Sequence, residues 1–228
     1  MLEGYGQVIL QGTWMTIELA LSALILAVII GLAGAAARLS RYPWLRAIGA
    51  TYTTIVRGIP DLVLMLLIFY GLQIALNQAT HALDLAHIDI APLPAGILTL
   101  GFIYGAYFTE TFRGAALSVP LGQREAAVAY GMTPWQCFAR ITFPLMMRFA
   151  LPAIGNNWQV ILKATALVSI LGLEELVKAT QLAGKSTWQP LFFALVAGAI
   201  YLLFTLVSQL ILSGLMRVYA VGVKKVTL

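Results

Sequence analysis

The chain has 228 residues, of which 61% are hydrophobic and only 10% are charged. Soluble domains carry about 25% charged residues, so most of the surface of this protein must face lipid. The net charge of +5 would suit a nucleic-acid partner, but the basic residues are spread over separate loops and form no basic module. The composition therefore predicts a membrane protein that binds no nucleic acid. The single cysteine, Cys137, excludes an internal disulfide.

Apolar stretches divide the chain into spans, each needing about 20 helical residues to cross a bilayer. Five spans are expected, at about 13–37, 59–78, 93–116, 149–171 and 190–216. The segment 42–57 is mixed in character and is expected to lie at the membrane surface as an elbow. No Lys or Arg precedes Arg38, so the first span lacks the basic start of a cleaved signal peptide and is expected to be retained. We predict an all-α membrane protein with a single domain over residues 1–228.

The basic residues predict the orientation of these spans. Eleven of the 14 Lys and Arg residues lie in the segments 38–57 and 113–148 and in the tail after residue 216. Cytoplasmic loops carry an excess of Lys and Arg, so these three segments are expected on the cytosolic side. Five spans with the N-terminus outside and the C-terminus in the cytosol satisfy this bias.

The interval 120–144, in the largest cytosolic loop, suits water and a protein partner. A short helix is expected near its start, where Ala126 and Ala127 would let another protein's backbone approach closely. Gly131 can supply the positive φ that ends a helix and turns the chain. Thr133 then fits the N-cap of a second short helix that precedes the fourth span.

The spacing within this interval is more specific than its composition. It reads Glu125-Ala126-Ala127, three residues, Gly131, nine residues, Ile141-Thr142-Phe143-Pro144. This pattern resembles the cytoplasmic loop by which permease subunits of ABC importers dock onto their ATPase, with Phe143 where leucine is usual. The blocks Arg57–Pro60, Glu110–Ala115 and Leu162–Leu167 are similar to those of polar-amino-acid permeases. The overall resemblance, over about 12–217, is strongest to the HisQ-type subunits of histidine/lysine/arginine/ornithine importers.

The resemblance implies a MetI-like type I importer permease fold in the bacterial inner membrane, and import of polar, cationic amino acids such as histidine, arginine, lysine and ornithine. It assigns ATPase coupling to Glu125, Ala126, Ala127, Gly131, Ile141 and Pro144. The implied partners are a second permease subunit (a HisM-like paralogue), two ATPase subunits, a periplasmic amino-acid-binding protein and the lipid bilayer. ATP and Mg would be used by the ATPase, so this chain would have no catalytic residue and bind no cofactor or metal.

Ionisable side chains inside spans are costly and indicate function by default. Glu110 and Arg113 lie three residues apart and are expected to form a structural ion pair at the cytosolic membrane edge, with substrate contact as the alternative. Asp61 follows Pro60 near a helix start, where a carboxylate is favoured by the helix dipole. Helix capping and a pore-lining role for Asp61 both remain open. Ala164 stands where many permeases of this type carry a polar residue, so the partner subunit could hold that substrate contact instead.

The fourth span is the least lipid-like of the five. Asn156, Gln159 and Lys163 fall near one helical face, and with Thr165 and Asp61 they are predicted to line a substrate path. A helix–helix interface would explain this polar stripe equally well.

Three features of the sequence bear on other functions. The segment 179–186 resembles a phosphate-binding loop, but it lies in a loop expected outside the cytosol and is interpreted as a chance match. An ion-coupled secondary transporter would use the intramembrane carboxylates, yet such carriers usually show internal repeats, which this chain lacks. A permease for another small solute, such as glutamine or an opine, is not excluded.

Overall fold

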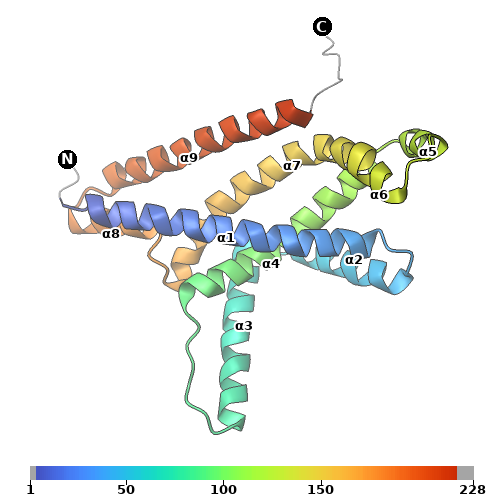
Figure 1. Cartoon of the computed structure of the whole chain (residues 1–228). Helices are drawn as coiled ribbons and strands as arrows, with labels where there is room; N and C mark the ends of the chain where they lie inside the picture. Colours follow the sequence, from blue (N-terminus) through green and yellow to red (C-terminus); the bar gives the residue numbers. More distant parts are fainter. Residues whose placement is uncertain (1–3, 220–228) are drawn as a thin grey trace.

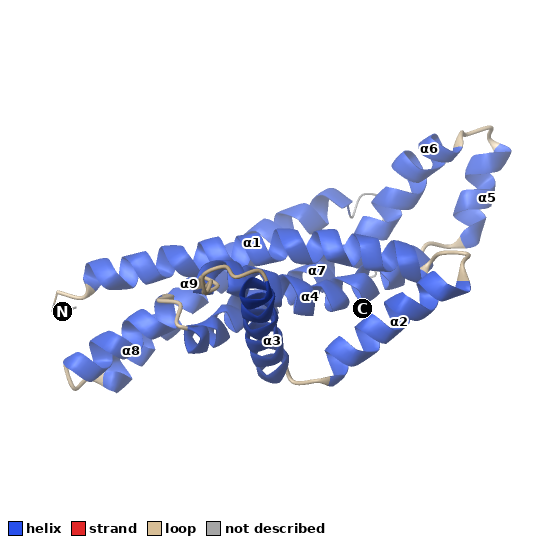
Figure 2. Cartoon of the chain, turned by 90° about the horizontal axis from the view of Figure 1, so that it is seen from below, coloured by secondary structure: helices blue, strands red, loops and turns tan. Residues whose placement is uncertain are grey.

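The computed structural model describes residues 4–219, which are helical apart from short connections. The helices are α1 (Gly6–Arg38), α2 (Pro43–Gly58), α3 (Asp61–Ala82), α4 (Pro92–Leu117), α5 (Leu121–Ala129), α6 (Pro134–Cys137), α7 (Phe143–Ala164), α8 (Leu176–Ser186) and α9 (Pro190–Tyr219). Helices α1, α4, α7 and α9 form an elongated bundle, with α8 at one end and α5 and α6 at the other (Figure 1). Helix α3 leaves the bundle at a steep angle and is seen almost end-on in Figure 2. Lys224 and Lys225, which contribute to the predicted orientation, lie outside the described residues.

Within residues 4–219, four helical segments are long and apolar enough to cross a membrane. They are α1, α3, the continuous segment Pro134–Leu171 and α9. The remaining predicted span, 93–116, corresponds to α4, whose sequence is interrupted by glycines, threonines, tyrosines and a glutamate. Tyr104 and Phe108 of α4 are fully buried by the neighbouring helices. Because protein and not lipid surrounds much of α4, its composition is less apolar than that of a lipid-facing helix.

Small residues let α1 and α4 cross closely. A Cβ placed on Gly31 would collide with Phe108, including the Phe108 carbonyl carbon at 3.0 Å. On α4, a Cβ on Gly101 would meet Leu26 and one on Gly105 would meet Ile30. Such stripes of small residues are typical of helix pairs in membranes, where close packing replaces the hydrophobic effect as the driving force.

The expected surface elbow is helix α2, which runs back along the end of α1 (Figure 1). Gly49, Thr53 and Val56 are buried against the bundle, whereas Trp44 and Ile48 are exposed on the opposite side. This amphipathic pattern explains why the segment looked mixed in sequence.

Candidate coupling site and polar groove

Helix α5 projects from one end of the bundle (Figure 1). It begins directly after Pro120, and Ala127 is its one buried residue. Glu125 and Ala126 are exposed. A short helix that has so little contact with its own chain offers almost its whole surface to another protein.

The turn after α5 is held by backbone geometry that requires glycine. Gly131 has a φ of +75°. Its N–H donates to the Val128 carbonyl at 2.9 Å, and the Met132 N–H donates to the Ala127 carbonyl at 3.1 Å. This pair of bonds is a Schellman motif, which satisfies the last carbonyls of a helix by means of a left-handed residue.

The next helix begins with a capping box. The Thr133 hydroxyl accepts a hydrogen bond from the Gln136 N–H, and the Gln136 side chain accepts one from the Thr133 N–H. The two residues thereby satisfy each other's free donors at the helix start. The direction in which the chain leaves the turn is therefore fixed on both sides of Gly131.

The second short helix continues into the fourth span without a break. A π-helical turn, Phe138–Thr142, joins α6 to α7, and Pro144 lies in the first turn of α7. Proline has no N–H and clashes with the carbonyl four residues before it, and the wider π turn relieves this conflict. Ile141 and Pro144 thus lie within one continuous helical segment. A groove of about 790 Å³ separates this segment from α5; it is lined by residues such as Arg124, Glu125, Val128 and Phe138.

Glu110 lies at the centre of a three-residue ion network. Arg113 contacts the Glu110 Oε2 at 2.8 Å, the pairing expected from their spacing on one helix. Arg38, at the end of α1, contacts the other carboxylate oxygen, Oε1, at 3.2 Å. Sequence reasoning missed Arg38, although it follows the first predicted span on the same side of the membrane as Glu110.

The polar residues predicted to line a path lie in different surroundings along α7 and the turn that follows it. The Gln159 side chain accepts a hydrogen bond from Thr205 of α9 at 3.1 Å, and the buried Thr165 hydroxyl contacts the Leu162 carbonyl and Tyr201. Asn156 and Lys163 lie on the exposed face of the helix. The predicted stripe is thus divided between a helix–helix interface and an open surface.

Other polar groups of α7 complete that interface. The Asn157 amide donates to Thr111 of α4 at 3.0 Å, and the Trp158 indole donates to Ser208 of α9 at 2.8 Å. Buried polar groups are stable only when such partners are present.

Asp61 is separate from the α7 residues. It is the first residue of α3, and its Oδ2 accepts a hydrogen bond from the Tyr104 hydroxyl at 2.8 Å. Tyr104 contacts Tyr107 one turn further along α4, with ring centroids 5.5 Å apart. The Arg57 guanidinium lies 5.4 Å from the centroid of the Tyr107 ring. The structure therefore groups Asp61 with α2 and α4.

A family model described as "Binding-protein-dependent transport system inner membrane component" matches residues 11–218. The chain belongs to this family. It is 65% identical, over the full length of both chains, to the histidine/lysine/arginine/ornithine transport system permease protein HisQ of Salmonella typhimurium. It is 41% identical to the octopine transport system permease protein OccQ of Rhizobium radiobacter, over 90% of this chain and 87% of that protein. The resemblance drawn from the sequence motifs is confirmed.

Solved structures confirm the fold expected for this permease family. A chain of an amino acid ABC transporter crystallised with histidines gives a TM-score of 0.79 at 29% identity, covering 93% of this chain and 94% of that one. A chain of the MetNI methionine ABC transporter in an inward-facing conformation gives 0.75 at 16% identity, covering 96% and 99%. This protein is thus an all-helical permease with the MetI-like fold, a non-catalytic membrane component of its transport system.

Helix α8 lies at the end of the bundle opposite α5 and begins at a buried carboxylate, Glu175. The segment 179–186 is part of helix α8 and not of a loop, so it lacks the backbone of a phosphate-binding loop. Glu175 caps α8 by accepting the N–H groups of Val177 and Lys178, both at 2.9 Å. Burial, opposed in part by these hydrogen bonds, raises the pKa of the Glu175 carboxyl above its ordinary value.

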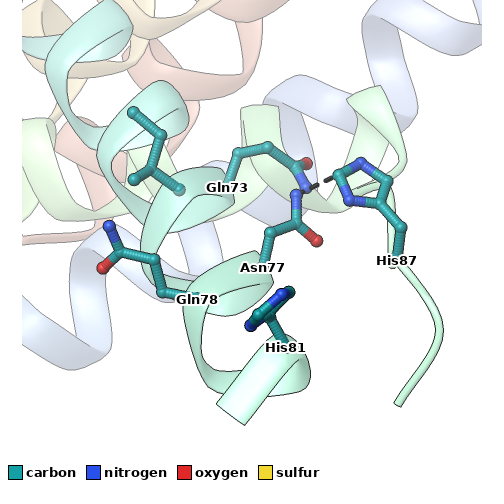
Figure 3. Close-up of a pocket in the computed structure, with 6 residues that line it drawn as sticks. Gln73, Asn77, Gln78, His81 and His87 are labelled. Atoms are coloured by element: carbon teal, nitrogen blue, oxygen red, sulfur yellow. Dashed lines mark hydrogen bonds between the residues drawn. The ribbon is translucent and has the colours of Figure 1, made fainter. Parts of the chain in front are cut away.

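The loop 83–91 is held against α3 by two amide side chains. Gln73 donates to the Ile88 carbonyl at 2.6 Å and accepts the Ile90 N–H at 2.9 Å, which fixes the orientation of its amide. Asn77 accepts the Ile88 N–H and contacts the His87 ring at 3.2 Å (Figure 3). These bonds fold the loop back along the helix, beside an open pocket of about 510 Å³ that is lined mainly by α3.

Proposed function

We propose that this chain is the membrane-spanning permease subunit of an ATP-driven importer for polar, cationic amino acids: histidine, arginine, lysine and ornithine. The observation that carries the proposal is the 65% identity, without gaps in coverage, to a histidine/lysine/arginine/ornithine permease. The exposed α5 with its fixed turn supplies the expected means of coupling to an ATPase.

The proposed topology has five spans, α1, α3, α4, α7 and α9, in the bacterial inner membrane, with the N-terminus outside and the C-terminus in the cytosol. Two facts support it. Arg38, Arg113 and α5 lie towards one end of the molecule, as the positive-inside bias requires of the cytosolic side. Helix α8 and the start of α1 lie at the opposite end (Figures 1 and 2).

The proposed complex contains a second permease of the HisM-like type, two ATPase subunits and a periplasmic amino-acid-binding protein. The exposed faces of α3 support the second permease, because this apolar helix packs mainly against α4 and, apart from the side that holds loop 83–91, leaves large apolar side chains exposed. ATP and Mg act on the ATPase subunits. This chain lines part of the substrate path and moves with the ATPase subunits. Its proposed coupling surface consists of Glu125, Ala126, Ala127, Gly131, Ile141 and Pro144.

Transport follows from alternating access. Closure of the ATPase dimer displaces α5, and the continuous helix from Pro134 to Leu171 moves with it. The path then opens outward and receives the amino acid from the loaded binding protein. ATP hydrolysis restores the inward-open state.

The test begins with gentle extraction of the tagged chain and mass spectrometry of the proteins that copurify. The expected result is a soluble ATPase together with a paralogous permease. The complex is then reconstituted with candidate binding proteins, and ATP hydrolysis is measured for each amino acid. A chain that is stable alone and transports without ATP would refute the proposal.

An opine importer is the second candidate, because of the 41% identity to an octopine permease. Opines such as octopine also carry a guanidinium group. Stimulation of ATP hydrolysis by octopine, but not by arginine or histidine, would favour this alternative.

A further inference from the structure

The start of α8 is held firmly against α1, near the end of the bundle opposite α5 (Figure 1). A Cβ placed on Gly12 would lie only 3.1 Å from the Glu175 carbonyl oxygen, so the two helices cross closely at this glycine. One turn further along α1, the Thr16 hydroxyl accepts the Leu176 N–H at 3.1 Å. The residue just before this cap, Glu174, is therefore fixed in position beside α1.

A groove of about 710 Å³ lies along this crossing. Six residues of α1 and one carboxylate line it: Leu10, Gln11, Thr13, Trp14, Met15, Ile17 and Glu174. Leu10 and Trp14 are 69% and 67% exposed, so large apolar side chains form an open surface there. A smaller cavity of about 60 Å³ shares Gln11 and Glu174 with the groove and adds Lys178 to its lining. The groove thus offers apolar surface for a hydrocarbon chain next to a pair of opposite charges.

The position of the groove along α1 matches the outer surface of the bilayer. In the proposed topology Arg38 marks the cytosolic edge of the membrane, and Ile17 precedes it by 21 residues. At roughly 1.5 Å per helical residue this distance is about 30 Å, the thickness of the hydrocarbon core. The segment 10–17 therefore lies at the level of the outer lipid headgroups, where tryptophan is enriched in membrane proteins.

The charged groups of the groove are available to a ligand. Glu174 and Lys178 lie one helical turn apart and are both exposed, yet neither forms an ion pair within residues 4–219. A carboxylate and the face of an indole are both attracted to an ammonium group, so Glu174 and Trp14 suit one cation together. The Lys178 ammonium suits a phosphate. Phosphoethanolamine carries both groups a few bonds apart, in the same arrangement of opposite charges.

We propose that the groove between α1 and α8 binds a phosphatidylethanolamine molecule of the outer leaflet. Its ammonium lies at Glu174 and Trp14, its phosphate lies at Lys178, and an acyl chain runs along Met15 and Ile17 towards the hydrocarbon core. An anionic lipid without an ammonium group binds less well, because it leaves Glu174 unpaired and brings a second negative charge close to it. The site goes beyond the proposed function and depends only on the proposed outer position of α8.

The test compares two lipids on the purified whole complex. Phosphatidylethanolamine and phosphatidylglycerol are titrated separately, and the lipid that stays bound is counted by native mass spectrometry. Phosphatidylethanolamine should bind more tightly to the wild type, and Glu174→Gln should reduce this preference about fivefold or more, as expected for a lost charge-assisted contact. Lys178→Gln should weaken both lipids, because both carry the phosphate. A phosphatidylethanolamine with a photoreactive acyl chain should crosslink to residues 10–17.

Two matched controls remove the same charges outside the groove lining. Asp84→Asn and Lys185→Gln should leave the lipid preference unchanged. A wild-type preference in Glu174→Gln would overturn the site, and an equal loss for both lipids in that variant would do the same, because it indicates a structural defect. Crosslinking of segment 10–17 to a partner subunit in place of the lipid would show that protein covers the groove and would also overturn the site.

Import of arginine by the same preparation separates this inference from the proposed function. A wild-type complex that imports arginine with ATP but shows no preference for phosphatidylethanolamine overturns the lipid site alone. A complex that binds the lipid as expected but neither hydrolyses ATP nor imports an amino acid with any candidate binding protein supports the lipid site and overturns the proposed function.

Discussion

Replacing Gly131 with valine tests whether the positive φ at this residue is needed for the turn after α5. The residue has a φ of +75°, and a Cβ added there would meet no atom within 4 Å. The cost is therefore conformational and not steric crowding by neighbours. The left-handed conformation costs a residue with a Cβ about 1–2 kcal/mol of conformational free energy, and it costs a β-branched residue more.

A loss of about 2 kcal/mol lowers the equilibrium constant for forming the turn about 30-fold. The proposed docking requires α5 to be held in place, so arginine uptake into proteoliposomes with the reconstituted complex should fall by about tenfold or more in Gly131→Val. Gly131→Asn should retain most uptake, since asparagine tolerates this conformation, and Gly131→Ala should lie between them. Gly114→Ala is the control, at a helical glycine that also has no neighbour within 4 Å.

Two results would refute this reasoning. Normal uptake by Gly131→Val at normal membrane levels would remove the coupling role from α5. An equal loss in Gly131→Asn and Gly131→Val would show that any side chain obstructs the docking surface, so that the backbone conformation is not the cause.

Three more predictions concern stability, measured by thermal unfolding of the purified complex. Gly31→Ala should destabilise it by about 1–3 kcal/mol through overpacking of α1 on α4, whereas Gly214→Ala, with open space around it, should not; equal effects would contradict the close crossing. Arg38→Gln should cost roughly 1 kcal/mol by removing one partner of Glu110, and an unchanged melting temperature would show that the pair contributes nothing. Burial raises the pKa of the Glu175 carboxyl, so its stabilising contribution is full at acid pH and is lost as the pH rises through the folded-state pKa. The stability of Glu175→Gln relative to the wild type should therefore increase as the pH rises from about 4, and a difference independent of pH would contradict this.

Local chemistry made the coupling stretch predictable. The Gly131 turn and the Thr133 cap each depend on residues within five positions of one another, and their sequence signatures state the required backbone directly. The spans were also predictable from local sequence, because the hydropathy of a segment shows whether it faces lipid or water. Helix α4 shows the limit of that signal, because a helix covered by protein no longer needs a lipid-facing composition.

Contacts between distant segments were not predictable. Arg38 and Glu110 lie 72 residues apart, and Asp61 and Tyr104 lie 43 apart. Periodicity placed Gln159 and Lys163 near one face of a helix, but it could not show that α9 covers only one of them. The π turn before Pro144 was also missed, since a proline at that position is equally consistent with the start of a new helix.

Residues Pro134–Leu171 form one continuous helical segment, which can transmit motion from one end to the other. Its 38 residues extend about 55 Å at roughly 1.5 Å per residue, with the coupling turn at one end and a 3-10 turn that ends at Gly172 at the other. A rigid rod of that length that tilts by about 10° moves its far end by about 10 Å. The π turn keeps α6 and α7 continuous, so in the proposed topology a tilt imposed near α5 on the cytosolic side would be transmitted to the outer end of this segment as a displacement of that size.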